Sequence, residues 1–147
     1  MKRLRKIMKN KILRIADANF NRAKEALRVI EDIFRFFTED KLLTQKTRVI
    51  RHELSNIFSK KMLKEMLSHR NSLQDIGKNV DYLELKRKDT QDILFANFQR
   101  AKESIRVLEE IFKIINKNKV GKFKKMRYNL YFLEKSAREK FNLHNNR

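Results

Sequence analysis

Two pairs of side chains that can hold an anion occur in this sequence at the same spacing. Asn19 is followed three residues later by Arg22, and Asn97 is followed three residues later by Arg100. The planar guanidinium fork of arginine donates two hydrogen bonds at once to a phosphate, a geometry that lysine does not offer. The pattern indicates a candidate anion-binding site made of two matching halves.

These residues belong to an internal duplication. Residues 18–35 read ANFNRAKEALRVIEDIFR and residues 96–113 read ANFQRAKESIRVLEEIFK, so that 12 of 18 positions are identical at an offset of 78. A second match, IRHEL at 50–54 and MRYNL at 126–130, follows at an offset of 76. Chance does not produce such self-similarity, so the chain contains two copies of one unit.

The elements that must position these side chains are helices. The chain has no proline and only two glycines, fewer turn residues than a β-rich chain of 147 residues needs. Apolar periodicity predicts helices at 14–37, 41–67, 90–116 and 121–142. We therefore predict an all-α fold in a single domain, with two helical hairpins (units 14–67 and 90–142) joined by a polar loop at 68–89. Together they would form a four-helix bundle, to which the N-terminus could add a further helix.

Asn19 and Arg22 interrupt the apolar face of the first helix. At 100° per residue, Asn19 falls in the middle of the apolar arc and Arg22 falls between Val29 and Ile33. Glu31 falls with the charged residues of the opposite side. The second copy repeats this pattern at the equivalent positions.

A buried arginine without a partner costs several kcal/mol, and an unsatisfied amide costs roughly 1–3 kcal/mol. Two interpretations therefore remain open. Internal Arg–Glu and Asn–backbone contacts could fix the pairing of the two halves, or the arginines could bind an anion in a polar cavity at the bundle centre. Glu25 and Glu103 lie at the edge of the apolar arc in their copies.

Other candidates have weaker signals. Asp17 precedes the first Asn–Arg pair, and the second copy has a phenylalanine at the equivalent position. This difference between the copies could mark a role for Asp17 in the chemistry, or Asp17 could be a helix N-cap. Arg51 and Arg127 occupy matching positions beside the apolar stripe of each second helix, where arginines also snorkel toward water. Arg70 and Asp75 lie in the connecting loop, which is a ligand lid or an ordinary turn.

The net charge of +19 is concentrated at the ends of the chain. Residues 1–14 carry seven Lys/Arg and no acid, and residues 113–147 carry a net charge of +9. The middle of the chain therefore carries 19 − 7 − 9 = +3. Such ends are typical of a solvated basic surface, although an anionic ligand and nucleic acid are also possible partners. We expect the aromatic residues to lie in the core rather than at base-stacking positions of the surface.

Several classes of site are excluded or disfavoured. The chain has no cysteine, and its three histidines are scattered. It contains neither a phosphate-binding glycine loop of the GxxxxGK[ST] type nor a GxGxxG fingerprint. No apolar run spans a bilayer and no secretory signal begins the chain, so we expect a cytoplasmic protein without a membrane contact.

The combined motifs resemble one small family. The residues that show this are DANFNRAKEALRVIED at 17–32, Arg51-His52, Arg70 with Asp75-x-Gly77, and ANFxRAxExxRVLEE at 96–110. They resemble the compact hydroxymethylpyrimidine phosphate kinases of thiamine biosynthesis, which occur alone or fused in front of thiamine phosphate synthase. The resemblance extends over roughly 12–140.

The resemblance implies transfer of the γ-phosphoryl group of ATP to 4-amino-5-hydroxymethyl-2-methylpyrimidine phosphate, in a standalone enzyme that uses Mg²⁺. Because Mg²⁺ prefers oxygen ligands, catalytic and metal-binding roles are expected for Asp17, Glu25 and Glu103, with the amides of Asn19 and Asn97 as further ligands. Phosphate or substrate contacts are expected from Asn19, Arg22, Arg51, Arg70, Asp75, Asn97, Arg100 and Arg127.

Two rival functions follow from the same sequence. The charge suggests a helical nucleic-acid-binding module, which the predicted burial of the aromatic residues disfavours. The resemblance also allows an inert partner of a thiamine enzyme, including association with thiamine phosphate synthase. Self-association is left open by the sequence.

Overall fold

The computed structural model describes residues 1–79 and 85–145, with side chains through residue 142, and within these ranges the chain forms helices and no strand. The α-helices are α1 (Lys2–Asp32), α2 (Lys41–Ile57), α3 (Lys60–Ser68), α4 (Thr90–Ile115) and α5 (Val120–Asn145). A π-helical turn η1 (Ile33–Phe37) extends α1, and a 3-10 turn η3 (Lys117–Lys119) precedes α5. The predicted all-α fold class is confirmed.

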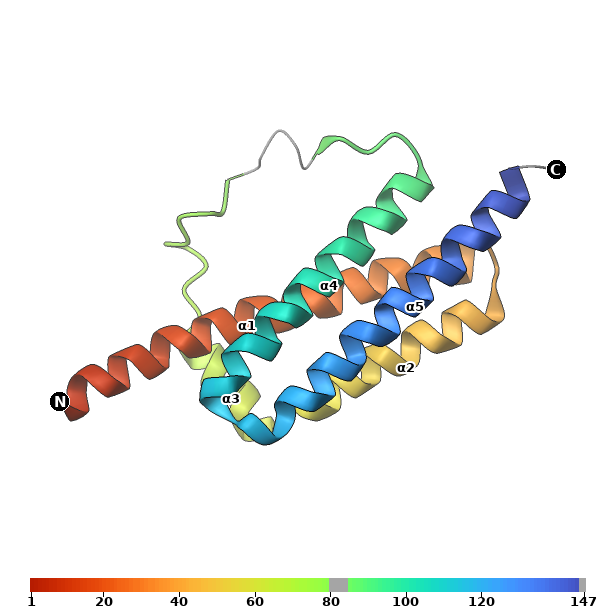
Figure 1. The fold of residues 1–147 in the computed structure, drawn as a ribbon. Coiled ribbons are helices and arrows are strands. Elements are labelled where there is room, and N and C mark those ends of the chain that lie inside the picture. Colours follow the sequence, from red (N-terminus) through yellow and green to blue (C-terminus); the bar gives the residue numbers. More distant parts are fainter. Residues whose placement is uncertain (80–84, 146–147) are drawn as a thin grey trace.

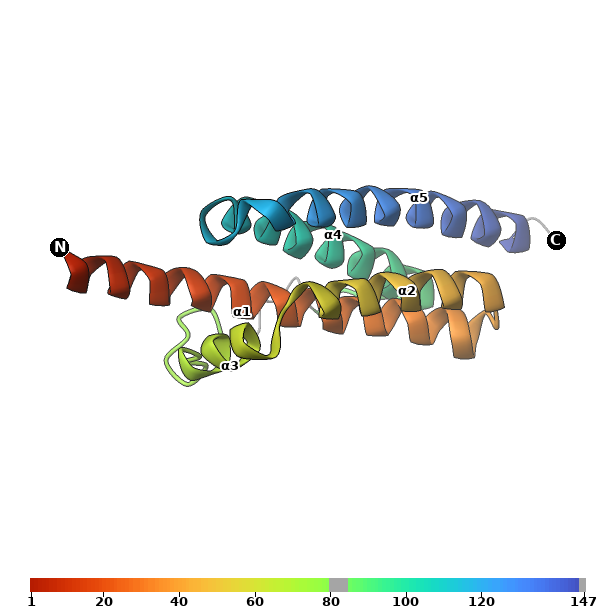
Figure 2. The same cartoon turned by 90° about the horizontal axis from the view of Figure 1, so that it is seen from below.

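The long helices form two layers, one for each copy of the unit. Figure 2 shows α1 and α2 in one layer and α4 and α5 in the other. The most extensive contact between elements joins the layers where α1 packs on α4. Leu27 and Ile30 of α1 and their equivalents Ile105 and Leu108 of α4 are completely buried there. The repeated apolar stripe is therefore the seam that holds the two copies together.

Helix α1 is longer than its sequence pattern indicated. We predicted a start at residue 14, but α1 begins at Lys2, and the segment that could have been an additional helix is continuous with it. Neither proline nor glycine interrupts residues 2–14, so nothing stops the helix from extending toward the N-terminus. Most of this extension is exposed and projects past the other helices (Figure 1).

The helix predicted at 41–67 is divided into α2 and α3. Phe58 has an extended backbone, with φ −95° and ψ 118°, and Ser59 caps α3 by accepting a 3.1 Å hydrogen bond from the backbone N–H of Met62. The break turns Phe58 into the core, where the centre of its ring lies 4.4 Å from the ring centre of Phe20 and 5.5 Å from that of Phe112. Burial of one aromatic ring thus favours the interruption over a continuous helix.

The second unit matches its prediction closely. Helix α4 spans Thr90–Ile115, against a prediction of 90–116, and α5 begins at Val120. Asp89 caps α4, because its Oδ1 accepts a 2.8 Å hydrogen bond from the backbone N–H of Asp92. Residues 70–79 and 85–89 of the predicted loop run outside the bundle (Figure 1), and residues 80–84 lie outside the described residues. Among the described helices, none combines the length and the apolar character needed to cross a bilayer.

Candidate functional site

The repeated polar residues of both copies line one cavity between α1 and α4. We call this cavity, of about 660 Å³, the paired groove. Its lining consists of Asn19, Arg22, Glu25, Ala26 and Val29 of α1 and of Asn97, Arg100, Glu103, Ser104 and Val107 of α4. Each residue of the first set corresponds to one of the second at the offset of 78. The duplication therefore builds the groove from two equivalent walls, which differ in type only at Ala26 and Ser104.

The two asparagines are buried, as the sequence predicted, and each is fixed by its own helix. The Nδ2 of Asn19 donates to the carbonyl of Ile15 at 2.9 Å, and the Nδ2 of Asn97 donates to that of Ile93 at 2.8 Å. A carbonyl only accepts hydrogen bonds, so this contact sets the orientation of each amide. Each Oδ1 has no partner among the described residues and is left as an acceptor for the groove.

The two arginines do not lie in the interior, and the prediction that they are buried is wrong. Arg22 and Arg100 have exposed side chains at the groove. A helix diagram places the Cβ atom, whereas the long side chain carries its charged end out to water. In the part of the chain that the structure describes, neither guanidinium has a hydrogen bond or an ion pair. Both are therefore available to an anion.

Glu25 and Glu103 face the same groove and are also exposed. Glu103 accepts a 2.9 Å hydrogen bond from Gln99, and Glu25 has no partner among the described residues. The predicted metal ligand Asp17 does not line the paired groove. Within residues 1–79 and 85–142, no group of three or more acidic or histidine side chains is gathered as a metal site. The carboxylates that the paired groove could provide to a metal ion are therefore those of Glu25 and Glu103, on opposite walls.

The other pair of repeated arginines is bound internally. Arg51 donates to the carboxylate of Glu31 at 2.8 Å, and Arg127 donates to that of Glu109 at 2.9 Å. The arginine side chains are each 13% exposed, and the glutamates are 1% and 4% exposed. The expectation that Arg51 and Arg127 bind substrate phosphate therefore conflicts with their ion pairs, which join the two helices of each unit.

Glu31 and Glu109 are the residues that the sequence reasoning missed. Glu31 is fully buried, not on the solvent side where we placed it. At 100° per residue it lies about 20° beyond Phe20, the last residue of the apolar arc. The second copy has a glutamate, Glu109, at the equivalent position, and this repetition was a further signal that both residues have structural partners.

Burial raises the pKa of the Glu31 carboxyl, but hydrogen bonds from Arg51 and Arg48 outweigh this effect and hold the pKa below its ordinary value. Burial also raises the pKa of Glu109, and its hydrogen bonds from Arg127 and Arg106 lower it further than burial raises it. Both carboxylates are therefore held in the ionised form that an internal ion pair requires.

Asp17 is neither an N-cap nor a member of the paired groove. It lies in the middle of α1, with a side chain that is 8% exposed. Arg70 binds it through two 2.8 Å hydrogen bonds, from Nε to Oδ2 and from Nη2 to Oδ1. Asn21 adds a 3.2 Å contact to Oδ1. The pair attaches the start of the connecting segment to the first unit.

A second cavity, of about 850 Å³, lies beside this ion pair, and we call it the loop-side cavity. Its lining is Lys11, Arg14, Ile15, Asp17, Ala18, Asn19, Asn21, Arg22, Glu25, Arg70, Asn71, Ser72 and Asp75. Asn19, Arg22 and Glu25 also line the paired groove, so the two cavities adjoin. Asp75 is exposed, and its Oδ1 accepts a 2.9 Å hydrogen bond from the backbone N–H of Gly77, which is the geometry of a local turn.

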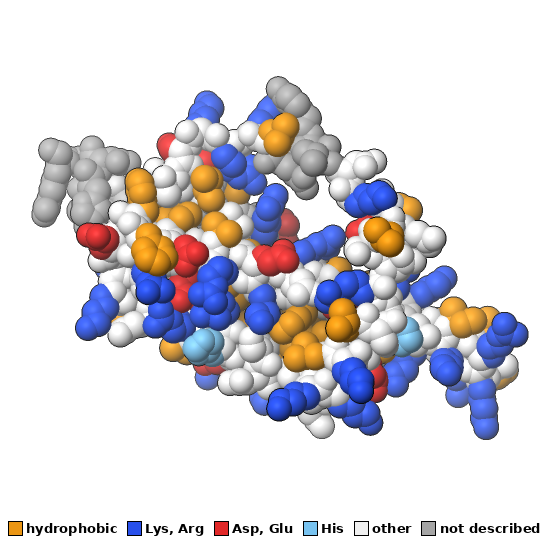
Figure 3. Space-filling view, turned by 180° about the vertical axis from the view of Figure 1, so that it is seen from behind, with side chains coloured by type: hydrophobic (Ala, Val, Ile, Leu, Met, Phe, Trp, Pro, Cys, Tyr) orange, Lys and Arg blue, Asp and Glu red, His pale blue; other side chains and the backbone are white. Residues whose placement is uncertain are grey.

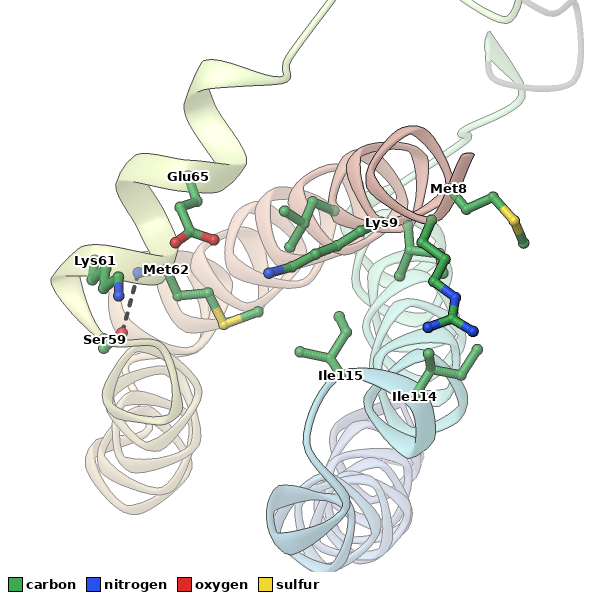
Figure 4. A pocket seen from close by; sticks show the side chains of 11 residues that line it. Met8, Lys9, Ser59, Lys61, Met62, Glu65, Ile114 and Ile115 are labelled. Carbon is green, nitrogen blue, oxygen red and sulfur yellow. Dashed lines mark hydrogen bonds between the residues drawn. The ribbon is translucent and has the colours of Figure 1, made fainter. Parts of the chain in front are cut away.

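A third cavity, of about 530 Å³, lies between the start of α1, α3 and the end of α4. Figure 4 shows Met62 and Ile115 facing each other across it and Lys9 extending into the space between them, whereas Met8 points away. None of its lining residues belongs to the repeated Asn–Arg motif. Six of its eleven lining residues are apolar, and its three cations, Arg5, Lys9 and Lys61, are accompanied by the carboxylate of Glu65.

Basic side chains are distributed broadly over the surface. Figure 3 shows Lys and Arg side chains spread over one face, including the projecting start of α1. The expectation that aromatic residues are confined to the core is wrong for Phe36 and Phe37, which are exposed on η1, and for Tyr128, Tyr131 and Phe132, which are exposed on α5. Cations already lie against these rings: Arg127 is 5.3 Å from the centre of Tyr128, and Lys46 is 5.7 Å from that of Phe132.

Comparison with known proteins places both copies of the unit in one family. The model of the ThiD2 family matches residues 14–136. A thiamine-phosphate synthase of Nostoc punctiforme is 36% identical over 124 residues, which are 84% of this chain and 34% of the relative. A thiamine-phosphate synthase of Thermosynechococcus vestitus is 34% identical over 127 residues, which are 86% of this chain and 35% of the relative.

The chain therefore spans about a third of the length of the curated relatives it matches. No solved structure matches it. Every residue that lines the paired groove lies within the matched range. By this match the chain belongs to the ThiD2 family.

Proposed function

We propose that this chain is a kinase of thiamine biosynthesis that transfers the γ-phosphoryl group of ATP to 4-amino-5-hydroxymethyl-2-methylpyrimidine phosphate. The product is the corresponding diphosphate. The single observation that carries the proposal is the pair of unpartnered guanidiniums, Arg22 and Arg100, on opposite walls of one cavity. Membership of the ThiD2 family and the thiamine-phosphate synthase relatives support the choice of substrate.

The arginines sort into two classes, and this sorting favours phosphate chemistry in the paired groove. Arg51 and Arg127 neutralise buried glutamates, whereas Arg22 and Arg100 have no acidic partner among the described residues. Two free guanidiniums at one cavity repel each other, and a bound anion relieves that repulsion. A reaction between two phosphate-bearing molecules brings several negative charges together, and these need such neutralisation.

The proposed reaction needs positioning more than it needs a strong base. An oxygen of the acceptor phosphate attacks the γ-phosphorus of ATP, a new P–O bond forms, and the bond to the β–γ bridging oxygen breaks to release ADP. The attacking oxygen is already anionic at neutral pH, so no proton has to be removed from it. We infer that Arg22 and Arg100 hold the two phosphate groups in line and stabilise the spread charge of the transferring group.

The donor set of the groove fits a nucleotide-bound Mg²⁺. Glu25 and Glu103 offer carboxylates, and Asn19 and Asn97 offer amide oxygens that no described residue occupies. Mg²⁺ commonly uses one or two carboxylates together with substrate phosphates, and it would reduce the negative charge of ATP here. Asp17 is occupied by Arg70, so its proposed contribution is to position the first unit rather than to ligate the metal.

The direct test mixes the purified protein with ATP, Mg²⁺ and the pyrimidine monophosphate, and measures the diphosphate by chromatography. We expect turnover with the monophosphate and none with the free alcohol, since the alcohol leaves an arginine of the groove without its anion. Absence of diphosphate at micromolar protein, while a known kinase works in the same mixture, would reject the proposal. Co-purification with a thiamine enzyme without turnover would instead favour an inert partner.

A nucleic-acid-binding module is the second candidate, and the exposed aromatic residues of α5 are the observation that favours it. Tyr128, Tyr131 and Phe132 lie beside cations, an arrangement that also suits base stacking. A gel-shift assay with single-stranded RNA at physiological salt separates the candidates. Micromolar or tighter binding that is lost in Tyr128→Ala would favour the module, whereas binding only at low salt would reflect net charge.

A further inference from the structure

The two copies differ in charge just before the repeated motif. Lys11 and Arg14 of the first copy correspond to Asp89 and Asp92 of the second at the offset of 78. Helix α1 continues through Lys11 back to the N-terminus, whereas α4 begins at Thr90. Asp89 and Asp92 cap α4, accepting hydrogen bonds from backbone N–H groups at 2.8 and 3.0 Å. The same stretch is a basic helix in one copy and an acidic cap in the other.

The basic residues of the first copy line the loop-side cavity. Lys11 and Arg14 have no hydrogen bond or ion pair with another described residue. The carboxylate of Asp17 in the same cavity is neutralised by Arg70. Lys11, Arg14 and Arg22 therefore leave more positive charge in this cavity than Glu25 and Asp75 cancel.

The loop-side cavity also continues from the paired groove. Asn19, Arg22 and Glu25 form a common wall of both, so one ligand can occupy both spaces. Arg14 and Arg22 are eight residues apart on one helix, which corresponds to about 12 Å along the axis. Arginine side chains are long enough to converge from these two positions on one phosphate chain.

The second copy lacks such a cavity wall. Phe95 replaces Asp17, and its ring packs 6.1 Å from Phe98 and 6.2 Å from Phe141. The guanidinium of Arg138 lies 4.0 Å from the centre of the Phe95 ring. The position that holds the Asp17–Arg70 ion pair at the loop-side cavity in the first copy is therefore filled by packed aromatic rings in the second.

We propose that the loop-side cavity is a polyphosphate subsite, in which Lys11 and Arg14 bind the phosphate chain of the donor and Arg22 binds its terminal phosphate. The acceptor phosphate then meets Arg100 at the other wall. The assignment of the donor as a nucleoside triphosphate rests on the proposed function, whereas the affinity for a phosphate chain does not. The difference between the two copies beside the paired groove would then determine which end of the groove binds the donor and which end binds the acceptor.

Calorimetric titration of the full chain with inorganic tripolyphosphate, and separately with inorganic monophosphate, tests the subsite at physiological salt. We expect tripolyphosphate to bind at least tenfold more tightly than monophosphate. In Lys11→Ala/Arg14→Ala, tripolyphosphate should bind roughly ten- to hundredfold more weakly. The matched control is Arg3→Ala/Lys6→Ala, which removes the same charge from the same helix at residues outside the loop-side cavity. It should bind as the parent does.

Equal weakening in both double variants would overturn the proposal, because it would reflect net charge alone. Unchanged binding in Lys11→Ala/Arg14→Ala would overturn it as well. A specific loss in that variant supports the subsite even where no kinase turnover is found, so failure of the subsite and failure of the proposed function can be told apart. A second titration, with ATP and Mg²⁺, then shows whether a nucleoside triphosphate uses the same cations.

Discussion

The Nε of Arg51 lies 2.8 Å from a carboxylate oxygen of the buried Glu31. The second copy repeats this ion pair between Arg127 and Glu109. In each unit the pair connects the first long helix to the second, behind the apolar seam. Arg51 and Arg127 thus stabilise the fold, whereas Arg22 and Arg100 have no acidic partner among the described residues and remain available at the paired groove.

Replacing either groove arginine should greatly reduce the proposed kinase activity while leaving the fold intact. We expect Arg22→Ala and Arg100→Ala each to lower kcat/KM by roughly 100-fold or more, as removal of a charge-stabilising donor does. The free energy of unfolding should change by less than about 0.5 kcal/mol, because neither side chain is buried or paired. Initial rates and urea titrations followed by circular dichroism measure the two effects.

The control for these two variants is Arg35→Ala. Arg35 is an exposed arginine on η1, the extension of α1, and its guanidinium lies over the ring of Phe36. It should retain full activity. Retention of activity in both Arg22→Ala and Arg100→Ala would remove the role that we assign to the paired groove.

Replacing Arg51 should have the opposite effect. Arg51→Ala leaves a buried carboxylate with less compensation, so we expect the free energy of unfolding to fall by about 3 kcal/mol. Arg48→Ala is the matched control, since it contacts the same Glu31 but its side chain is 43% exposed, and it should cost much less. A variant Arg51→Ala that is as stable as the parent but inactive would show that Arg51 binds ligand instead.

Stability should decline in acid because of the buried glutamates. The folded-state pKa values of Glu31 and Glu109 lie below the ordinary value of 4.5. Their stabilising contribution is therefore complete above about pH 4.5 and is lost as the pH falls through the lower folded-state values. Asp40, whose pKa is also lowered by hydrogen bonds from Leu43 and Lys140 that outweigh its burial, acts in the same direction.

Urea midpoints measured between pH 7 and pH 3 should show this decline. Glu109→Gln should be less stable than the parent at pH 7 and should show a shallower dependence on pH below 4.5. An identical slope in parent and variant would mean that other carboxylates cause the acid transition.

Breaking the ion pair of Asp17 and Arg70 should release the start of the connecting segment. In Arg70→Ala we expect faster amide hydrogen exchange over 71–79, measured by mass spectrometry, because the bidentate contact with α1 is lost. Lys78→Ala removes a charge and a hydrogen bond to the carbonyl of Leu73 from the same segment without touching α1, and should speed exchange over the segment much less than Arg70→Ala does. Equal exchange rates in all three proteins would show that the pair does not restrain the segment.

The duplication made much of the fold predictable from the sequence. Two copies of an amphipathic pattern gave the all-α class, the bounds of α4 to within a residue, and the burial of Asn19 and Asn97. The start of α1 was missed because no cap or breaker marks residue 14. The break after Ile57 was missed because it depends on tertiary burial of Phe58, which local periodicity does not report.

The residues that line the candidate site were predictable from the sequence, but their burial and contacts were not. Spacing alone indicated that Arg22 and Arg100 would come together, yet it gave the wrong burial, since the position of a charged end depends on the whole side chain. Glu31 was misplaced because a helix diagram lacks the neighbouring helix that carries Arg51. The charge difference between Lys11 and Asp89 became informative only once the loop-side cavity was known.

The packing of α1 on α4 has a consequence for how such a protein could have originated. One copy alone supplies only half of the groove lining and exposes its seam residues Leu27 and Ile30, so a single-copy ancestor would have had to associate with itself. Tandem fusion freed the halves from having to remain identical. One copy could then acquire basic residues while the other acquired an acidic cap. Such a difference is impossible in a symmetric homodimer, because its two subunits have the same sequence.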